Sequence, residues 1–576
     1  MRRIAILLQF TRRKHFFVTT PIFYANASSI AAPHIGHLYS ALIADAAYRW
    51  NVLKRADSSG APPCSLFTTG TDEHGTKIQK AAQAAGVQPK LFCDDVSASF
   101  RKLLSAFNIK PTDFIRTSES RHKRVVEDVW LRLSRRGYIR KAKYAGWYST
   151  TDECFYSQRD LEDLCINGTT KKVIFLLHVK RSRVIGLVKR INQSKLLIRE
   201  DFIERGISLS ALIVEVSKQT RSPVEWIEED NYVFDLSQFY EPIRRWLLEN
   251  DVIRPKHYLR VALQYLDIEE TLSISRDRKR LEWGIPVPQD QSQTIYVWMD
   301  ALVNYLTVSG FPRSHHDYWP PDWQVIGKDI LKFHAVFWPA FLMAAELPLP
   351  RRLFVHAHWL VDGVKMSKSI GNVIDPFVVA ETLTVDGLRY FLLRQGTPHV
   401  DGNFTITKAV SVVNGELVNS LGNLMQRACV EKLNPDRIYP SFEEKVMRSE
   451  LAELGLPLIE SLGSLREKCS QHFDELMIYK ALEELSAVVR QANAFFQLFE
   501  PWKLADGEKV FFRTYIFRKS NERQVCLQGG KVHFQRSTIL HVVYETMRIC
   551  GILLQPVVPD YANKLLTRYC LLVDLS

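Results

Sequence analysis

The chain has 576 residues, of which 46% are hydrophobic and 24% charged, and its formal net charge is +13. This length allows several domains with separate cores, and the composition excludes a wholly disordered or fibrous protein. The nine cysteines include no Cys-x-x-Cys pair, which argues against a disulfide framework and a zinc ribbon and favours a reducing compartment.

The positive charge is concentrated in three segments rather than spread along the chain. Residues 1–14, 157–221 and 507–536 together carry 25 Lys or Arg and nine Asp or Glu, so the remainder is slightly acidic. Net charge is therefore weak evidence for RNA binding. The longest apolar stretch, 335–345, is too short to span a membrane, and we expect no membrane association.

The N-terminal segment 1–14, MRRIAILLQFTRRK, alternates arginine pairs with apolar residues, and no acidic residue precedes Asp45. This pattern is typical of a short mitochondrial presequence and predicts a location in the mitochondrial matrix. A disordered basic tail is the alternative.

The first ordered segment combines a strand, a turn and a helix. Residues 17–20 form a β-branched and aromatic run that ends at Pro21, and His34-Ile35-Gly36-His37 precedes an Ala- and Leu-rich helix over 38–47. A helix N-terminus after a strand binds anions through its free N–H groups and its dipole. Alone, this pattern would equally fit a helix start with two surface histidines.

A second strand–loop–helix unit follows, with a strand over 65–69, a loop over 70–75 and a helix over 76–85. Ligands bind at the carboxyl ends of strands in open α/β sheets. Asp72 in this loop suits an ammonium group and His74 a ribose or phosphate, although solvated loop residues are the alternative.

Further strands and helices alternate up to residue 385. Trp298, Ala301 and Tyr305 have the spacing of one helix face, for which core packing is the alternative. Lys365 and Lys368 flank a hydroxyl on a loop with glycines at 363 and 371, which suits a mobile phosphate clamp. From Val385 onward we expect no strands but a helix bundle, with helices over 410–433, 451–469, 473–498 and 539–556.

Taken in order, these motifs resemble those of one family. FVTTPIFYAN, PHIGH, TGTDEHG, YVWMDALVNY, IGKDILKFHAVFWPA, KMSKSIGNV and PWK are similar to motifs of methionyl-tRNA synthetases of the mitochondrial type, which are class I aminoacyl-tRNA synthetases. The resemblance covers most of the chain outside the basic segments.

The resemblance implies an α/β fold, with a Rossmann-type catalytic domain interrupted by a connective insertion and followed by an all-α anticodon-binding helix bundle. The implied limits are a presequence over 1–14, the first catalytic half over 15–142, the insertion over 143–255, the second half over 256–372, a stem-contact region over 373–405 and the bundle over 406–576.

It also implies the activity, namely ATP-dependent activation of L-methionine and transfer of the methionyl group to tRNA(Met), with Mg²⁺. The implied catalytic residues are His34, His37, Lys365 and Lys368. The residues implied to bind ATP are Gly36, Lys365, Met366, Ser367, Lys368 and Ser369.

The same resemblance assigns two further groups of residues. Those implied to bind methionine are Ile22, Tyr24, Asp72, Trp298, Ala301, Tyr305 and His334. Those implied to read the anticodon are Asn419, Asn423 and Trp502, although Trp502 would also suit the core at the end of the bundle.

The chain departs from the family pattern in three places. Ser149 and Asp152 stand where a first pair of zinc-binding cysteines would be, so we predict no structural zinc. Asn26 lies eight residues before His34, four more than in the family. Segments 157–221 and 507–536 match no family feature and are either translated intron or RNA-contacting insertions.

Three alternative functions stay open on sequence alone. The chain could be a catalytically impaired RNA-binding paralogue or the product of an aberrant gene model. A small-molecule nucleotidyltransferase with the same His-x-Gly-His turn is the third, but it would not explain the helix bundle.

Overall fold

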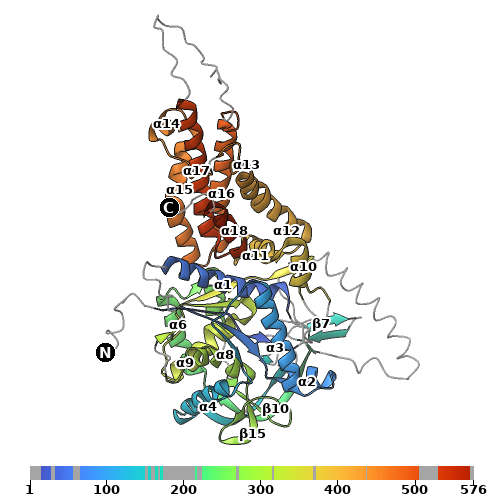
Figure 1. Cartoon of the computed structure of the whole chain (residues 1–576). Helices are drawn as coiled ribbons and strands as arrows, with labels where there is room; N and C mark the ends of the chain where they lie inside the picture. The colour runs from blue at the N-terminus through green and yellow to red at the C-terminus, as the bar shows by residue number, and fades with distance from the viewer. Residues whose placement is uncertain are drawn as a thin grey trace, which may run out of the picture.

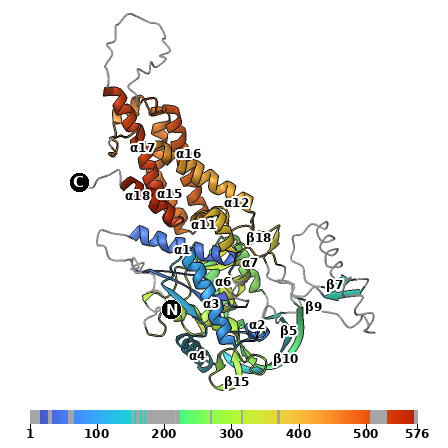
Figure 2. The same ribbon diagram turned by 45° about the vertical axis from the view of Figure 1, so that its right-hand side comes forward.

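The computed structural model describes residues 15–26, 33–55, 65–149, 154–156, 163–166, 169–172, 215–216, 223–267, 271–313, 317–366, 371–435, 437–504 and 530–570. Within them, an α/β body carries a helix bundle on one side, and helix α1 (Ile35–Arg55) lies between the two (Figures 1 and 2). The presequence, the four extra residues before His34 and most of the two atypical segments fall outside the described residues.

A seven-stranded parallel sheet forms the centre of the α/β body. Its order is β11-β17-β16-β1-β3-β2, with β4 on the other edge of β3. The strands are β1 (Phe16–Thr19), β2 (Phe23–Tyr24), β3 (Ser65–Asp72), β4 (Asp113–Arg116), β11 (Ile253–Arg254), β16 (Trp323–Gly327) and β17 (Leu353–His356).

Strand β3 is longer than predicted, because it continues through Gly70 to Asp72. A Cβ atom at Gly70 would lie 1.9 Å from the carbonyl oxygen of Ile115 on β4. This glycine therefore allows two backbones to approach closely rather than ending the strand. The extension places Asp72 beside Tyr24 of β2.

Alternate residues of each central strand enter two separate cores, as the period of a strand requires. Val18 and Phe354 join the core that includes α1 and continues into the bundle, whereas Phe17 and Val355 join the core on the opposite face. The helices that cover the sheet are α2 (Thr76–Ala84), α3 (Pro89–Ala106), α4 (Ser120–Arg135), α6 (Tyr240–Glu249), α7 (His257–Tyr265), α8 (Val297–Val308) and α9 (Trp338–Ala344).

A second, antiparallel sheet is formed where β5 (Ile139–Ser149) pairs with β10 (Pro223–Phe234) over ten residues. β6 (Cys154–Tyr156), β9 (Glu215–Val216) and β12 (Leu272–Ser273) extend it. Beside it lie β13 (Ser275–Asp277), β14 (Pro286–Val287) and β15 (Asp290–Ile295), and farther out the hairpin of β7 (Asp163–Ile166) and β8 (Thr169–Lys172).

The C-terminal part is helical, as predicted, but one short strand interrupts it. β20 (Gly402–Asn403) pairs with β18 (Trp359–Val361), which pairs with β19 (Val364–Lys365), so the prediction of no strands beyond residue 385 was wrong. The helices are α10 (Pro376–Leu383), α11 (Val385–Gln395), α12 (Ile406–Val413), η7 (Asn414–Gly422), α13 (Asn423–Ala428), α14 (Glu444–Ser449), α15 (Ala452–Asp474), α16 (Ile478–Phe499), α17 (Gly530–Leu554) and α18 (Pro559–Cys570).

Helix α17 is long and apolar enough over 534–554 to pass a length and composition test for a membrane span, but 67% of that window is buried inside the protein. It is therefore the core helix of the bundle.

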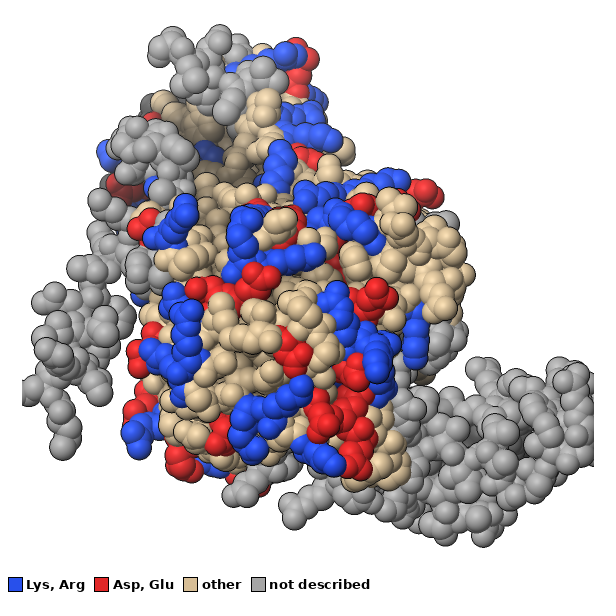
Figure 3. Space-filling model, turned by 90° about the horizontal axis from the view of Figure 1, so that it is seen from below, with Lys and Arg blue, Asp and Glu red and all other residues tan. Residues whose placement is uncertain are grey.

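Charge is mixed on the face seen from below in Figure 3, where basic and acidic side chains alternate and neither sign gathers into a patch.

Arg389 on α11 joins the α/β body to the bundle at a fully buried position. Its guanidinium donates to Asp45 Oδ2 of α1 at 2.7 Å, to the carbonyl oxygen of Phe107 at 2.8 Å and to that of Val557 at 2.8 Å. These three acceptors belong to α1, to the end of α3 and to the turn between α17 and α18, so one side chain holds three segments together.

Replacing Arg389 by methionine should lower the free energy of unfolding by about 3–5 kcal/mol, because it removes one of the two arginines that pair with the buried Asp45 and leaves two buried backbone oxygens without this donor. Urea denaturation followed by circular dichroism would measure this loss. Arg448→Met is the control, since Arg448 pairs with Glu444 on an exposed helix face and should change stability by about 0.5 kcal/mol or less. Equal losses in the two variants would contradict the assignment.

Candidate active site

A cavity of about 290 Å³ opens at the carboxyl ends of β1, β16 and β17. At this point the strand order reverses, because the chain continues from β1 to β3 on one side and from β16 to β17 on the other. This is the position at which parallel α/β sheets bind ligands. The residues that line the cavity are Pro21, Ile22, Phe23, Tyr24, His34, Gly36, His37, Tyr39, Ser40, Gly327, Asp329, Ile330, His356, Ala357, His358, Trp359, Lys365 and Met366.

His34 and His37 lie together at the start of α1, with ring centroids 3.7 Å apart. The backbone N–H of Gly36 donates to Nδ1 of His34 at 3.1 Å, and the backbone N–H of His34 donates to Nδ1 of His37 at 3.3 Å. Because both Nδ1 atoms accept hydrogen bonds, Nε2 is the nitrogen that carries the proton in each ring. The local backbone thus makes both imidazoles donors at their outer nitrogen.

Two aromatic rings hold His37 in place. Phe23 and Phe100 contact it edge-on at centroid distances of 5.3 and 5.2 Å, and they stack on each other at 4.7 Å. Gly36 leaves room beside the His34 ring, since a Cβ atom there would lie 2.8 Å from Cε1 of His34. A larger residue would displace the ring.

Asp329 is the acidic group of the cavity. It forms ion pairs with Lys365 of β19 and with Nε2 of His358, the latter at 3.0 Å. Burial alone would raise the pKa of Asp329, but these two partners outweigh it and hold the pKa well below its usual range. The Asp329 carboxylate therefore holds Lys365 at the cavity mouth. A second ion pair lies nearby, between Lys328 and Asp401 at 2.7 Å.

His356, at the end of β17, connects that strand to α1. Its Nδ1 donates to the carbonyl oxygen of Ala357 at 2.9 Å, so its Nε2 accepts from the hydroxyl of Ser40 at 2.8 Å. Burial lowers the pKa of His356 to about 4, which keeps the ring neutral near pH 7. The Ser40–His356 bond fixes α1 against the sheet one turn after the paired histidines.

Four of the residues expected to bind methionine lie in the cavity wall or are connected to it by hydrogen bonds. Ile22 and Tyr24 line the cavity, as does Ile330, whose carbonyl oxygen accepts from Nδ1 of His334 at 2.9 Å. Nε2 of His334 then accepts from the Tyr305 hydroxyl at 2.8 Å. Burial lowers the pKa of His334 to about 4, so this histidine is also neutral.

Two of the expected methionine residues lie on the first turn of α8. Trp298 stacks on Phe333 with centroids 3.6 Å apart, and Ala301 is buried next to it on the helix. Phe333 begins η6 (Phe333–Phe337), a π-helical turn that also carries His334. Such turns occur often at functional sites, because they rotate side chains out of the normal helical phase.

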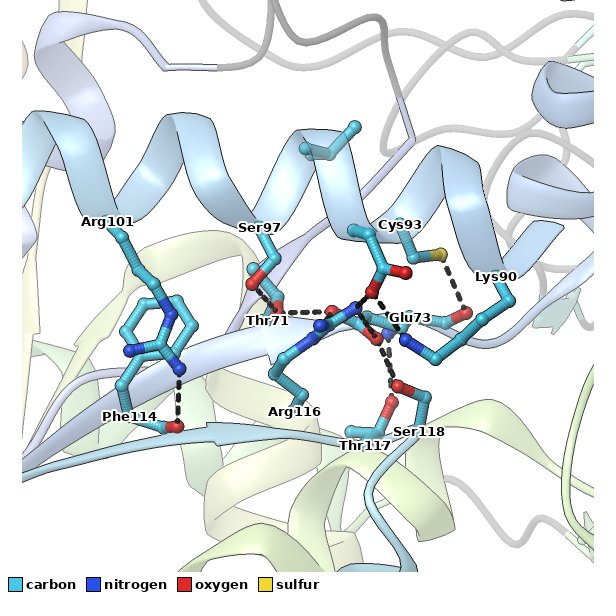
Figure 4. A network of polar contacts seen from close by, with 12 residues as sticks. Thr71, Glu73, Lys90, Cys93, Ser97, Arg101, Phe114, Arg116, Thr117 and Ser118 are labelled. Carbon is cyan, nitrogen blue, oxygen red and sulfur yellow. Dashed lines mark hydrogen bonds and ion pairs between the residues drawn. The ribbon is translucent and has the colours of Figure 1, made fainter. Parts of the chain in front are cut away.

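The loop that follows β3 is buried and held by its neighbours, contrary to the alternative of solvated loop residues. Glu73 is fully buried and accepts from Arg116 through both oxygens at 2.6 and 3.0 Å, from Thr71 at 2.7 Å and from Ser118 at 2.5 Å (Figure 4). His74 is not among the residues that line the cavity, and its Nδ1 lies 2.6 Å from Asp300 Oδ2. A role for His74 toward ribose or phosphate is therefore not supported.

The three residues expected to read an anticodon lie on the bundle, away from the cavity. Asn419 in η7 and Asn423 in α13 are exposed. Trp502 is half-buried, in contact with Phe496 at 5.6 Å, and the Arg427 guanidinium stands 5.1 Å above its ring. Trp502 is thus partly a core residue and partly accessible.

Some expected residues are not among those described, namely Ser367, Lys368, Ser369 and Asp152. Within the described ranges, no group of three or more His, Cys, Asp or Glu side chains could hold a metal ion. The absence of structural zinc therefore stays a prediction.

Comparisons with known proteins agree with this geometry. The model of the family described as class I tRNA synthetases (M) matches residues 16–173 and 202–429. The mitochondrial methionine–tRNA ligase of Bos taurus is 42% identical over 570 residues, which are 97% of this chain and 84% of that protein. That of Takifugu rubripes is 43% identical over 566 residues, which are 97% and 83%.

Solved structures agree as well. Mycobacterium tuberculosis methionyl-tRNA synthetase bound by methionyl-adenylate is 33% identical with a TM-score of 0.78, and the match covers 96% of this chain and 93% of that one. The chain belongs to the class I methionyl-tRNA synthetase family. The family model passes over 174–201, a narrower segment than the 157–221 that seemed atypical in sequence.

Among the cavity residues of this family member that were missed in the sequence are Ser40, Asp329, His356 and His358. A signal for three of them was present, since polar residues follow two buried strand patterns at 326–329 and 355–358. Nothing local indicated which strands are neighbours, and without that order the two polar ends could not be brought to one site.

His334 and His356, which are both buried and neutral, should make the stability of this synthetase fold depend on pH. Their native pKa of about 4 is below the ordinary value of 6.5, so acidification from about pH 6.5 to 4 protonates the unfolded chain first and lowers stability. His356→Gln should make the decline shallower by about one proton, roughly 1.4 kcal/mol per pH unit. Urea titrations at several pH values would measure both slopes, and identical slopes would contradict the assignment.

Proposed function

We infer that this protein is a mitochondrial methionine–tRNA ligase. It activates methionine with ATP to methionyl-adenylate and transfers the methionyl group to tRNA(Met). The observation that carries this conclusion is the nearly full-length match to mitochondrial methionine–tRNA ligases, together with a cavity that combines two imidazoles, a lysine and a helix N-terminus. The alternatives of an RNA-binding paralogue and a small-molecule nucleotidyltransferase are not favoured.

The first reaction step needs positioning and charge neutralisation rather than a base. The methionine carboxylate is already a nucleophile, and its attack on the α-phosphorus of ATP releases pyrophosphate as the P–O bond to the leaving group breaks. We propose that the Nε2–H groups of His34 and His37 donate to the phosphoryl oxygens as negative charge moves onto them. Gly36 gives the nucleotide its approach to the helix N-terminus.

Lys365 is proposed to contact the phosphate chain in competition with Asp329. In the structure the Asp329 carboxylate holds this lysine, and a triphosphate entering the cavity would attract it more strongly because it carries more charge. Lys368 with Ser367 and Ser369 would act on the same phosphates from the following loop. Contacts completed only in the transition state raise turnover.

Mg²⁺ is proposed to enter with the nucleotide. Asp329 is the one carboxylate among the described residues that line the cavity, and Mg²⁺ usually keeps several waters and binds through one or two carboxylates and substrate phosphates. The bound ion would neutralise phosphate charge. The side chains present fit this mode and not a site made wholly of protein ligands.

The methionine side chain is proposed to lie among Ile22, Tyr24, Trp298, Ala301 and the hydrogen-bonded pair of Tyr305 and His334. Aromatic rings suit a thioether, and each S–π contact contributes about 0.3–1.5 kcal/mol. Asp72, at the end of β3, would bind the ammonium group. Because His334 is held neutral, it adds no positive charge that would repel the ammonium group.

The bundle is proposed to recognise tRNA(Met) through Asn419, Asn423 and Trp502. These residues offer base-edge hydrogen bonds and a stacking surface, which are the means by which proteins read unpaired RNA. The division into catalytic halves, connective insertion, stem-contact region and anticodon-binding bundle with the limits given above is part of the same proposal.

Methionine-dependent exchange of pyrophosphate into ATP tests the function directly. His37→Ala should lower the kcat of exchange by about 10²–10³-fold with little change in the KM for methionine, because a transition-state donor is lost. His399→Ala is the control, since His399 is exposed, contacts another histidine at 5.6 Å and does not line the cavity. No exchange by the folded wild type would overturn the proposed function.

Trp502→Ala should raise the KM for tRNA(Met) in the aminoacylation assay by about 10-fold or more, since stacking of one base contributes about 1–3 kcal/mol. The ATP–pyrophosphate exchange should not change, because that step needs no tRNA. Lys503→Ala, next in the chain and paired with Glu500 at the surface, serves as the control. A matching loss of exchange in Trp502→Ala would indicate a folding defect instead.

A further inference from the structure

Asp300 on α8 is a buried carboxylate, 1% exposed, to which the proposed mechanism assigns no role. Two histidines from different segments contact it. Nδ1 of His74 lies 2.6 Å from Oδ2, and Nε2 of His122 lies 2.7 Å from Oδ1. His74 belongs to the loop after β3, and His122 to the first turn of α4.

These contacts connect the two parts of the proposed methionine site. Helix α8 carries Trp298 and Ala301 within one turn of Asp300, and these residues would contact the amino-acid side chain. His74 follows Asp72 by two residues, and Asp72 would bind the ammonium group. The His74–Asp300 bond therefore links the ammonium site to the side-chain pocket, although the two are more than 220 residues apart in the chain.

The loop from Asp72 to His74 is also held on the side that faces away from Asp300. There, Arg116 and Ser118 hold the Glu73 carboxylate, and Figure 4 shows both reaching it from β4 and the residues that follow. Trp283 donates to the backbone oxygen of Glu73 at 2.5 Å, and its ring lies 5.6 Å from that of His74. With Glu73 held in this way, the contact between His74 and Asp300 sets how far this loop lies from α8.

The electrostatics show why an ionised group is retained here. Burial would raise the pKa of Asp300, but the two imidazoles outweigh it and lower the pKa to about 2, so the carboxylate is ionised. A buried ion contributes little net stability compared with a well-packed apolar residue, but it demands donors in fixed directions. Two ring N–H groups directed at one carboxylate fix the orientation of both rings.

We propose that Asp300 is a positioning residue for amino-acid binding, which acts through His74 to set the distance between the Asp72 carboxylate and the thioether pocket on α8. This rests on the proposed function. If Asp300 had a purely structural role, its loss would lower stability and would not change methionine binding more than ATP binding. A positioning role would weaken methionine binding and leave ATP binding unchanged, because the ATP cavity is bounded by other segments.

The test is ATP–pyrophosphate exchange with the full chain, with methionine and ATP varied separately. Asp300→Ala should raise the KM for methionine by about 10-fold or more, because a displaced Asp72 would lose its charged hydrogen bond to the ammonium group. The KM for ATP should stay within about twofold of wild type. Asp300→Asn keeps the shape and one ring contact, so it should show a smaller rise of the same kind.

Thr307→Val is the matched control. Thr307 is on the same helix, is also buried, and its hydroxyl lies 2.9 Å from the other ring nitrogen of His122. Its loss disturbs the His122 side of the network but not the His74 side, so the KM for methionine should stay within about twofold of wild type while the melting temperature falls.

His74→Ala and the double variant with Asp300→Ala complete the design. If Asp300 acts through His74, the double variant should raise the KM for methionine no further than either single variant. His74→Ala also carries the test if Asp300→Ala does not fold, because it leaves the Asp300–His122 contact in place. An unchanged KM for methionine, an equal rise in both KM values, or an equal effect of Thr307→Val would overturn the proposal. Absence of exchange in wild type would instead overturn the proposed function.

Discussion

The buried pair of Arg389 and Asp45 is the contact on which the relation between the α/β body and the bundle depends. Arginine is suited to this position because its planar fork can donate to several acceptors at once, whereas a lysine would satisfy fewer. Here the acceptors are a carboxylate and backbone oxygens from three segments. The end of α3 and the turn between α17 and α18 are thereby held against a single helix, α1.

That helix, α1, also carries the paired histidines at its N-terminus. Along its length, Tyr39 donates to the backbone oxygen of Gly396 at 2.9 Å, and Trp50 stacks on Phe473 of α15 at 4.8 Å and donates to Asp474 at 3.0 Å. The core on this face of the sheet continues without a break into the bundle. The bundle is therefore packed directly against α1, and the two share one core.

Much of the site could be predicted from the sequence because its motifs are local. The turn with His34 and His37, the helix with Trp298 and Tyr305, and the clustering of polar residues after β3 each follow from a few adjacent residues. The partners of those residues could not be predicted in the same way. The ion pair of Lys365 with Asp329 and the contact of Ser40 with His356 depend on the strand order β1-β16-β17, which composition and periodicity do not determine. The length of β3 was underestimated for a related reason, since only the close approach of β4 explains Gly70.

Three acidic side chains that are almost fully buried, Asp45, Glu73 and Asp300, share one arrangement, in which each is held by cationic or imidazole donors from a distant segment. Apolar residues in these places could give equal stability but no fixed direction. Direction matters in this site, because an apolar pocket discriminates one methylene by only about 1–3 kcal/mol. Selection of methionine must then rely also on the separation between the ammonium ligand and the thioether pocket. In the proposed site that separation is set by a hydrogen bond between buried groups, so recognition of a small apolar side chain depends on the charges around it.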